Sequence, residues 1–272
     1  MNRLFGAWMA GIAMVSSALG AGGSATIVFE LPAGMPPGLA IPIPGRIVDA
    51  PKTAKVLRLK ADIFGEKPLL AQREREGDVV WVVAGLRQKV PRTLRLRVQA
   101  TVVNQRGATP RLTIFKKPAG LEFRDKGRPV MFYQRMAHSL DGGKHVAANY
   151  VHPLYGLDGE VLTQNFPDDH RHHHGIFWAW HQLWVGKLRA GDPWINKDFL
   201  PIVRAADVID QGPVFATLMT RVEWTSPLVT DESGVRRPIV AERGWMRVFR
   251  CEADSRHVDF SIELTAQLDA VR

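Results

Sequence analysis

Cysteine is almost absent from this chain of 272 residues, and Cys251 is its single thiol. One thiol cannot form an internal disulfide, which excludes a disulfide-stapled scaffold. The neighbouring residues, from Val248 to Glu252, have the pattern of a strand. The thiol is therefore interpreted as a small buried hydrophobe rather than as a catalytic nucleophile.

Long apolar runs and helical periodicity are missing as well. After the N-terminus, no stretch could cross a membrane, and no long segment has a convincing period of 3.6 residues. No internal repeat and no nucleic-acid-binding motif are found. These absences exclude a multi-span membrane protein and a helical bundle, and they argue against nucleic acid as a partner.

The N-terminus has the pattern of a secretory signal peptide. Arg3 gives it a positive charge, residues 4–19 form an apolar run with small residues, and Ala18-Leu19-Gly20 is an acceptable cleavage site. Residues 1–20 are therefore predicted to be removed, and the mature protein is predicted to be periplasmic or secreted. An uncleaved anchor is the alternative, although the run is short for a bilayer span.

The residues from 25 to 117 predict a small basic β-module. Short β-branched runs separated by glycine and proline favour strands near residues 25–31, 55–61, 78–83, 93–103 and 111–115. Their number and spacing predict a small all-β module, immunoglobulin-like in size. The five prolines in residues 32–44 predict an extended loop there.

Positive charge is concentrated in this module. Residues 51–118 contain 16 Lys or Arg against 5 Asp or Glu, a balance of +11, whereas the whole chain carries +9. Arg95 and Arg97 alternate with apolar residues, which places them on one face of a strand. A solvated strand face is favoured over a surface for an anionic partner.

Residues 120–272 predict a second β domain, a β-sandwich. Strand-like runs occur near residues 127–133 and 215–224, and residues 258–266 show the cleanest period of two in the chain. The sequence stops at Arg272, soon after this strong strand. We therefore expect either that the chain is a truncated form of a longer domain or that it pairs an edge strand unusually.

One stretch, residues 149–199, gathers most of the residues that carry chemistry. It contains six of the nine histidines and four of the eight tryptophans, interleaved with carboxylates. This density predicts a site. The alternative is that several histidines only hydrogen-bond to loops and that Trp178 and Trp180 belong to the core.

A metal site is one hypothesis for this stretch. On an extended strand, His170, His172 and His174 would share one face. Three imidazoles could bind a divalent metal such as Zn²⁺, with a nearby carboxylate as a further ligand. The spacing matches no established metal motif, so the cofactor stays open.

Acid–base chemistry on a carbohydrate is the second hypothesis. An imidazole paired with a carboxylate can exchange protons with a hydroxyl group, and indole rings can stack on sugars. The candidate acids are His172, His173 and His174, and the candidate base is Glu160 or Glu223. The candidate substrate-binding residues are Asn149, Tyr155, Asp169, Trp178, Trp180, His181, Trp184, Trp194 and Lys197.

The segments NYVHPLYGLDGEVLTQNFPDDHRHHHGIFWAWHQLWVG and GDPW…KDF resemble the methane oxygenase PmoA-like family, over about residues 129–272. The resemblance implies an exported bacterial protein with a β-sandwich, whose relatives continue past the position of Arg272. Methane oxidation itself is not expected, because the enzymes that perform it span the membrane many times and this chain does not. The His-His-Gly turn also resembles sites of mutarotase-type sugar-binding sandwiches, which use a His/Glu pair.

Three functions remain open at this point. The first is an exported protein that binds or processes a carbohydrate or a related polar small molecule, as a hydrolase, lyase or epimerase. The second is a metal-dependent oxidative or hydrolytic enzyme. The third is a non-catalytic binding or structural module. The sequence leaves the oligomeric state open.

Overall fold

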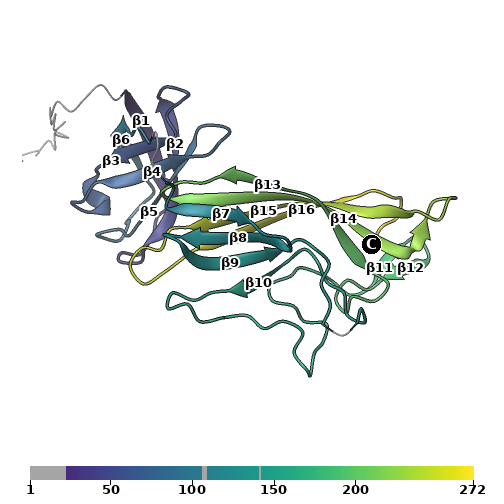
Figure 1. The fold of residues 1–272 in the computed structure, drawn as a ribbon. Coiled ribbons are helices and arrows are strands. Elements are labelled where there is room, and N and C mark those ends of the chain that lie inside the picture. The colour runs from purple at the N-terminus through teal and green to yellow at the C-terminus, as the bar shows by residue number, and fades with distance from the viewer. Residues whose placement is uncertain (1–22, 106–108, 141) are drawn as a thin grey trace, which may run out of the picture.

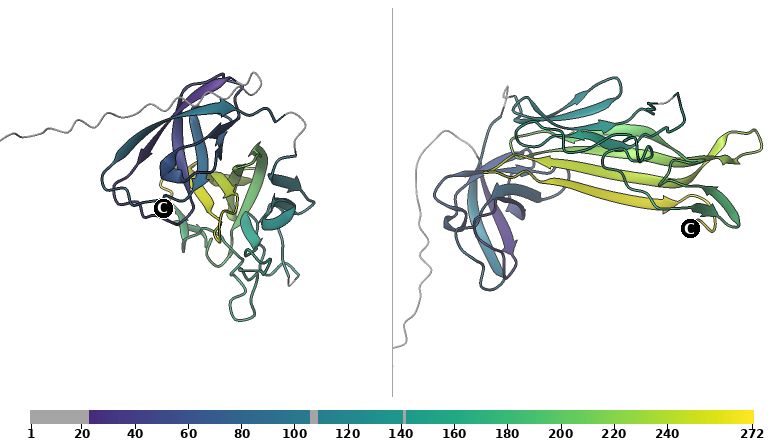
Figure 2. Two further views of the ribbon diagram at one scale, coloured as in Figure 1. Left: turned by 90° about the vertical axis from the view of Figure 1, so that its left-hand side faces the viewer. Right: turned by 90° about the horizontal axis from the view of Figure 1, so that it is seen from below.

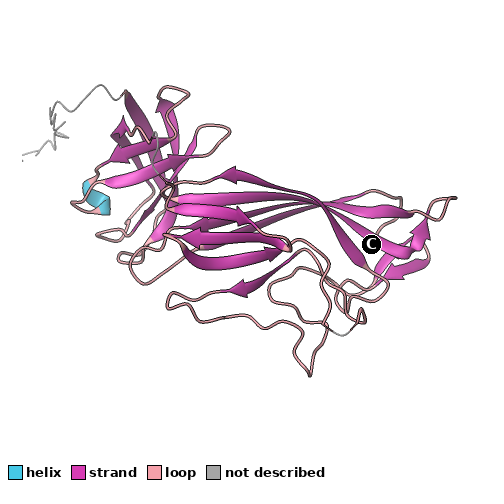
Figure 3. Ribbon diagram, viewed as in Figure 1, coloured by secondary structure: helices cyan, strands magenta, loops and turns pink. Residues whose placement is uncertain are grey.

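The computed structural model describes residues 23–105, 109–140 and 142–272, so the segment predicted as a signal peptide lies outside the described residues. The described part of the chain is built from strands, and the only helical element in it is a short 3₁₀ turn, Asp62–Phe64 (Figure 3). The all-β prediction is confirmed. Within the described ranges, no helix is long and apolar enough to span a membrane.

The N-terminal module is a closed barrel of six antiparallel strands, in the order β1-β2-β5-β4-β3-β6. Its strands are β1 (Ser24–Leu31), β2 (Ile41–Asp49), β3 (Val56–Leu59), β4 (Leu69–Arg73), β5 (Val79–Ala84) and β6 (Leu94–Val102). Strand β6 pairs with both β1 and β3, which closes the sheet on itself and removes its free edges. The small β-module predicted from the sequence is therefore present, with the topology of a closed barrel rather than an immunoglobulin-like one.

Side-chain alternation along the strands places apolar side chains inside the barrel and charged side chains outside it. The side chains of Ile27, Phe29 and Val98 are buried in the barrel core. Arg95 and Arg97 are exposed on the outside of the barrel. The basic strand face predicted from the sequence is present. The loop predicted at residues 32–44 ends earlier, because β2 begins at Ile41 and pairs there with β5. The two prolines of this part of β2 lie before its pairing with β1 begins.

The C-terminal part is a sandwich of two four-stranded antiparallel sheets, ordered β10-β9-β8-β7 and β13-β14-β15-β16. The first sheet contains β7 (Leu112–Lys116), β8 (Gly120–Asp125), β9 (Arg128–Gln134) and β10 (Tyr150–Leu154). The second contains β13 (Leu200–Asp210), β14 (Phe215–Thr230), β15 (Arg236–Phe249) and β16 (Val258–Ala266). Strand β7 pairs with β8, so the domain boundary predicted at residues 117–120 falls inside a hairpin of the sandwich.

A shared apolar core holds the two sheets together. Fully buried side chains of β9, including Val130 and Met131, pack against Leu218 of β14 and Met246 of β15. The long strands β14 and β15 continue past the first sheet, away from the barrel (Figures 1 and 2). A hairpin of β11 (Leu183–Val185) and β12 (Leu188–Gly191) lies beside their far end.

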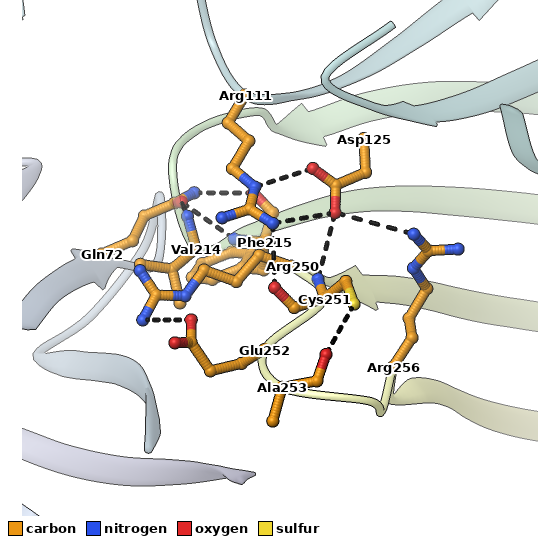
Figure 4. A network of polar contacts seen from close by, with 10 residues as sticks. All are labelled: Gln72, Arg111, Asp125, Val214, Phe215, Arg250, Cys251, Glu252, Ala253 and Arg256. Atoms are coloured by element: carbon orange, nitrogen blue, oxygen red, sulfur yellow. Dashed lines mark hydrogen bonds and ion pairs between the residues drawn. The ribbon is translucent and has the colours of Figure 1, made fainter. Parts of the chain in front are cut away.

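The barrel is fixed to the sandwich by buried polar contacts (Figure 4) and also by an apolar patch. The amide of Gln72, on β4, donates to the carbonyl of Phe215 and accepts from the backbone N–H groups of Val214 and Phe215. Arg250 donates to the carbonyl of Val83. Because the Gln72 amide is buried and its oxygen and nitrogen are both hydrogen-bonded across the junction, the two modules form a defined junction rather than a flexible linkage.

Candidate functional site

A buried carboxylate, Glu242 on β15, forms the centre of the candidate site. It is 1% exposed. Its Oε2 accepts hydrogen bonds from the indole N–H groups of Trp178 (2.9 Å) and Trp224 (2.7 Å), and the amide of Asn149 donates to both of its oxygens at 3.0 and 3.1 Å. All three donors are neutral. Glu242 is therefore held by hydrogen bonds alone, with no cation at hydrogen-bond distance.

Asn149 links this carboxylate to the other sheet. Its backbone lies in the left-handed region at φ 60°, which asparagine adopts more readily than most residues, and its N–H donates to Gln134 of β9. Its side-chain oxygen accepts from the hydroxyl of Tyr133 at 2.7 Å. Burial, reinforced by the charge of Glu242, raises the pKa of Tyr133, so the phenol stays protonated and remains a donor. This fixes the direction of the chain Tyr133 to Asn149 to Glu242.

His174 enters the same region from the loops between β10 and β11. It is followed by Gly175, whose φ of 66° and close approach to the carbonyl of Val151 exclude a side chain there. The imidazole is 3% exposed and packs between Tyr150 and Phe177, with ring centroids 4.8 and 4.1 Å away. The tight turn at Gly175 thus turns one histidine of the run inward.

The protonation state of His174 follows from its contacts. Burial lowers its pKa to about 4, despite the opposing hydrogen bond to the carbonyl of His172, so the ring is neutral at neutral pH. Its Nδ1 lies 2.7 Å from that carbonyl, which can only accept, so Nδ1 carries the proton. Nε2 is then an acceptor, and no residue in the described part of the chain hydrogen-bonds to it.

A cavity connects these groups. It encloses about 20 Å³, room for about one water molecule, and its lining includes Asn149, His174, Trp178, Asn196 and Trp224. The neighbouring cavity measures about 280 Å³ and shares Asn196 and Phe199 with the first.

The lining of this outer cavity also carries charges: Lys144, Asp198 and Arg236. The inner cavity has the Glu242 network directly behind it. The two cavities together form a recess that is polar and charged at its mouth and aromatic at its base. We call these two adjoining cavities the recess.

The predicted metal set of His170, His172 and His174 does not form. The segment from 168 to 173 consists of turns rather than a strand, closed by the contacts of the His170 and His173 N–H groups with Pro167 and His170 carbonyls. His174 points into the core, away from the face predicted for it. Among the described residues, no three His, Cys, Asp or Glu side chains are arranged to hold a metal ion.

His170, His172 and His173 instead form a cluster of their own near the surface. Their ring centroids lie 4.4 to 5.9 Å apart, and Nδ1 of His170 is 3.1 Å from the carboxylate of Asp169. Desolvation and the neighbouring imidazoles lower the pKa of His172. Two of the three predicted catalytic histidines, His172 and His173, therefore lie together, but His174 alone reaches the recess.

His181 and Trp194 form a separate group. Nδ1 of His181 lies 3.1 Å from the carboxylate of Asp192, which Arg189 also contacts at 3.0 Å. Burial opposes the ionisation of Asp192, but its hydrogen bonds with His181 and the Ile195 amide outweigh it and hold the pKa below the usual value. Trp194, 36% exposed, contacts the rings of both His181 and His173, with centroids 5.7 and 6.0 Å away, and so connects this group to the histidine cluster.

Neither predicted base lies in the recess. Glu223 faces the opposite side of β14 from Trp224 and pairs with Arg204 at 2.7 Å, because successive side chains of a strand alternate between its faces. Glu160 is exposed in a turn, where its carboxylate lies over Gly156. The predicted His/Glu pairing with Glu160 or Glu223 is not made in this structure, and Glu242 is the carboxylate that lies beside the inner cavity.

The remaining predicted residues divide between core and surface. Trp180 stacks on Trp224 with centroids 4.7 Å apart and belongs to the apolar cluster at the far end of the sandwich. Trp184 packs under the guanidinium of Arg272, 5.1 Å away. Tyr155 is half-buried at the end of β10, and Lys197 is exposed. Of the predicted ligand-binding residues, only Asn149 and Trp178 line the inner cavity.

Three residues of the site that the sequence did not predict lie outside the histidine-rich stretch, residues 149–199. Glu242 and Trp224 lie on β15 and β14, and Tyr133 lies on β9. A charged residue at an inward position of a strand would have pointed to Glu242, since its neighbours Val240 and Gly244 share its face. The pairing of that carboxylate with two distant indoles depends on the sandwich itself.

The C-terminal part of the chain matches a known family model. A family model described as a family of unknown function, DUF6807, matches residues 120–272, which is more than half of the chain. No curated protein matches, and no solved structure matches. The resemblance to the PmoA-like family stays a prediction, because nothing in these comparisons tests it.

Proposed function

We propose a function for this chain, which belongs to the DUF6807 family of unknown function: the recess binds a carbohydrate or a related polyhydroxylated small molecule. The observation that carries the proposal is the Glu242 network. A carboxylate held by one amide and two indoles has fixed, oriented polar groups beside flat apolar rings. Sugars combine hydroxyl edges with apolar C–H faces, so this combination suits them.

The sizes of the two cavities indicate which part of the ligand each would hold. The outer cavity, about 280 Å³, lies near the lower end of the range of small-molecule sites, which begins at about 300 Å³. It accommodates one sugar ring against Phe199. The inner cavity holds about one water, so a single hydroxyl of the ring would take that place, beside Asn196 and the Nε2 of His174.

The roles of the inner residues follow from their hydrogen-bonding capacity. His174 presents an unprotonated Nε2, which accepts a bond from a ligand hydroxyl. Glu242 Oε1 has one donor, Asn149, whereas Oε2 has three, so Oε1 retains capacity for another. Trp178 places its ring at the cavity wall while its N–H is held by Glu242.

Acid–base catalysis on the bound sugar is the second candidate function, favoured by the free Nε2 of His174. A neutral imidazole in a cavity is a proton acceptor for a hydroxyl. His174 takes the role of base here, in place of the acid role predicted for it. Activity is expected to fall as the pH drops toward about 4, where His174 becomes protonated.

Binding is tested by calorimetry and thermal shift against a panel of neutral and acidic monosaccharides, with the mature chain. We expect at least one sugar to bind saturably and to lose at least about tenfold in affinity in His174→Gln and in Asn196→Ala. Product analysis after incubation with the bound sugar separates the two candidates: a converted sugar, with conversion lost in His174→Gln, favours catalysis.

Two matched variants serve as controls. Glu223→Gln removes a carboxylate from the outer face of the same sheet, and Trp184→Phe changes a tryptophan outside the recess. Both are expected to bind like the unaltered protein. The proposal would be overturned if no sugar bound saturably, or if the recess variants and the control variants lost affinity equally.

Export to the periplasm or the medium is part of the same proposal and rests on the sequence of residues 1–20 alone. It is tested by sequencing the N-terminus of the protein recovered from a bacterial host. A mature chain that begins at Ala21 supports it, and an intact Met1 in the cytoplasmic fraction contradicts it.

A further inference from the structure

A large cavity lies at the junction between the barrel and the sandwich, apart from the recess. It measures about 1110 Å³ and is lined by the segment before β3, by the end of β4 and by the end of β13. We call it the junction groove. Its volume exceeds the range of about 300–1,000 Å³ that is usual for small-molecule sites, so it has room for several linked units of a ligand.

The walls of the junction groove are held in place before any ligand arrives. Gln72 makes three hydrogen bonds across the junction, and Glu74 pairs with Arg247 at 2.7 Å. Arg247 also lies over the rings of Trp81 and Phe215, about 5 Å from each centroid. A ligand would therefore meet a rigid surface and would lose little affinity to reorganisation of the protein.

Three cations in the groove have no carboxylate within ion-pair distance in the described part of the chain, although the charge of Arg75 acts on Asp210 from farther away. Arg73 and Glu74 are engaged by Asp78 and Arg247, but Lys52, Lys55 and Arg75 form no ion pair within the described part of the chain. All three are exposed. Free cations facing a cavity attract anionic groups, with a strength that salt reduces.

One carboxyl group completes the set. Asp210, at the end of β13, is only partly exposed and lines the groove. Burial raises its pKa, although the Arg75 amide and the Arg247 guanidinium oppose this. Perturbed carboxyl groups in clefts are frequent at binding sites, and a carboxyl group can both accept from hydroxyls and, when protonated, donate to them.

Aromatic rings are missing from the groove lining, as far as the described residues show. Single-stranded nucleic acids are bound by stacking bases on such rings, and neutral sugars are often bound by stacking as well. Recognition in the junction groove must instead depend on charge and hydroxyl contacts. Binding by stacking on aromatic rings, as proposed for the recess, is therefore not expected in the junction groove. A ligand with repeated acid groups is favoured instead.

We propose that the junction groove binds an acidic oligosaccharide, with Lys52, Lys55 and Arg75 contacting its carboxylate or sulfate groups and Asp210 contacting its hydroxyl groups. The site is separate from the recess in position and in chemistry. Under this proposal, part of the positive charge of the barrel binds a ligand on the side of the barrel that faces the sandwich.

Calorimetry with three probes tests this proposal: tri-galacturonate for carboxylates, a sulfated tetrasaccharide for sulfates, and maltotriose as the neutral probe. We expect at least one acidic probe to bind saturably at one site per chain, and its affinity to fall several-fold between about 50 and about 300 mM salt. Maltotriose is expected to bind at least about tenfold more weakly.

The variant Lys52→Ala/Lys55→Ala/Arg75→Ala is expected to lose at least about tenfold in affinity for the acidic probe. Its matched control is Arg46→Ala/Arg95→Ala/Arg97→Ala, which removes three exposed charges from the outer face of β2 and β6 and leaves the groove intact. All six residues are exposed, so both variants are expected to fold, which their thermal unfolding checks.

Further variants separate this site from the recess. His174→Gln and Asn196→Ala are expected to bind the acidic probe unchanged, and Asp210→Ala to bind it about three- to tenfold more weakly. An acidic probe that never saturates, a neutral probe that binds as well, or equal losses in the two triple variants would overturn the proposal. An unchanged affinity in Asp210→Ala would overturn the role given to that residue.

Discussion

Two buried carboxylates define two different regions of this molecule. Asp125, 4% exposed, lies at the junction side of the sandwich, where Arg111 contacts both of its oxygens and Arg256 lies 3.7 Å away (Figure 4). Glu242, 1% exposed, lies beside the recess and is met by an amide and two indoles. The burial is similar, but one carboxylate has cationic partners and the other has none.

The difference predicts a structural role for Asp125 and, under the proposed function, a binding role for Glu242. Burial opposes the ionisation of Asp125, but the hydrogen bonds from Arg111 and the Cys251 amide outweigh it and hold its pKa below the usual value. The negative charge of Asp125 is compensated by the adjacent Arg111 and Arg256. Glu242 keeps polar groups oriented without neutralising cations, which is an expensive arrangement for stability alone. Such an arrangement is more readily explained by a ligand that completes it.

The largest expected effect comes from Asp125→Ala. It leaves Arg111 and Arg256 facing each other without a carboxylate, and breaking a buried pair in this way costs about 3–5 kcal/mol. The guanidinium groups keep some contact with water, with side chains 25% and 13% exposed, so we expect the lower end, about 3 kcal/mol. Urea unfolding measures the loss.

Its control is Glu223→Ala, which breaks the exposed pair with Arg204 and is expected to cost about 0–1 kcal/mol. Sugar binding in the recess is expected to survive Asp125→Ala below the unfolding transition. A loss of stability no larger than that of the control would contradict the structural role of Asp125.

The second effect is the pH dependence of the two regions. The unfolded chain protonates His174 near pH 6.5 and the folded chain only near pH 4, so the unfolded state binds more protons in between. Stability therefore falls as the pH drops from about 6.5 to about 4, by up to about 3 kcal/mol from this residue. Asp125 acts in a lower window, because its folded pKa is depressed and its stabilisation is lost only as the pH falls below about 3.8.

Unfolding free energies measured from pH 3 to 7, for the unaltered chain and for His174→Gln, check this prediction. The variant is expected to lose most of the slope between about pH 4 and 6.5 and to keep the acid limb below it. Equal slopes for the two proteins in the upper window would show that His174 is not buried as a neutral base.

The third effect is that of Glu242→Gln, which keeps the shape of the side chain and removes its charge. No cation is left unpaired, but one amide N–H₂ then faces the donor of Asn149, so we expect a loss of about 1–2 kcal/mol, less than for Asp125→Ala. Sugar affinity is expected to fall at least about tenfold. Unfolding and calorimetry on the same preparation give both values, and a stability loss above that of Asp125→Ala would reverse the comparison.

The sequence predicted much of the fold because strand patterns are local. Arg95 and Arg97 alternate with less exposed residues on β6 as predicted, and the strand predicted at residues 258–266 is present as β16. Barrel closure was not predictable in the same way, because it depends on β6 pairing with β1 across about 70 residues of sequence. A list of strands does not contain that pairing.

The site was predicted in part for the same physical reason. Asn149, His174 and Trp178 lie in the dense stretch that the sequence singled out. The run of histidines indicated shared strand faces, but turns at residues 168–173 separate His174 from its neighbours. The partner carboxylate was sought nearby in sequence and lies on β15, 68 positions after His174. Long-range pairing of strands decides which polar groups meet, and composition does not record it.

The smallest effect sharpens the comparison most closely, because it changes one hydrogen bond. Trp178→Phe removes the indole N–H that donates to Oε2 of Glu242 at 2.9 Å and keeps a ring at the cavity wall. We expect a loss of about 0.5–1.5 kcal/mol in stability and a several-fold loss in sugar affinity. Trp184→Phe is the matched control, since it alters the contact with Arg272 and leaves Glu242 untouched. If both variants bind sugar equally well, the indole N–H does not position the carboxylate, and Glu242 would join Asp125 as a structural residue.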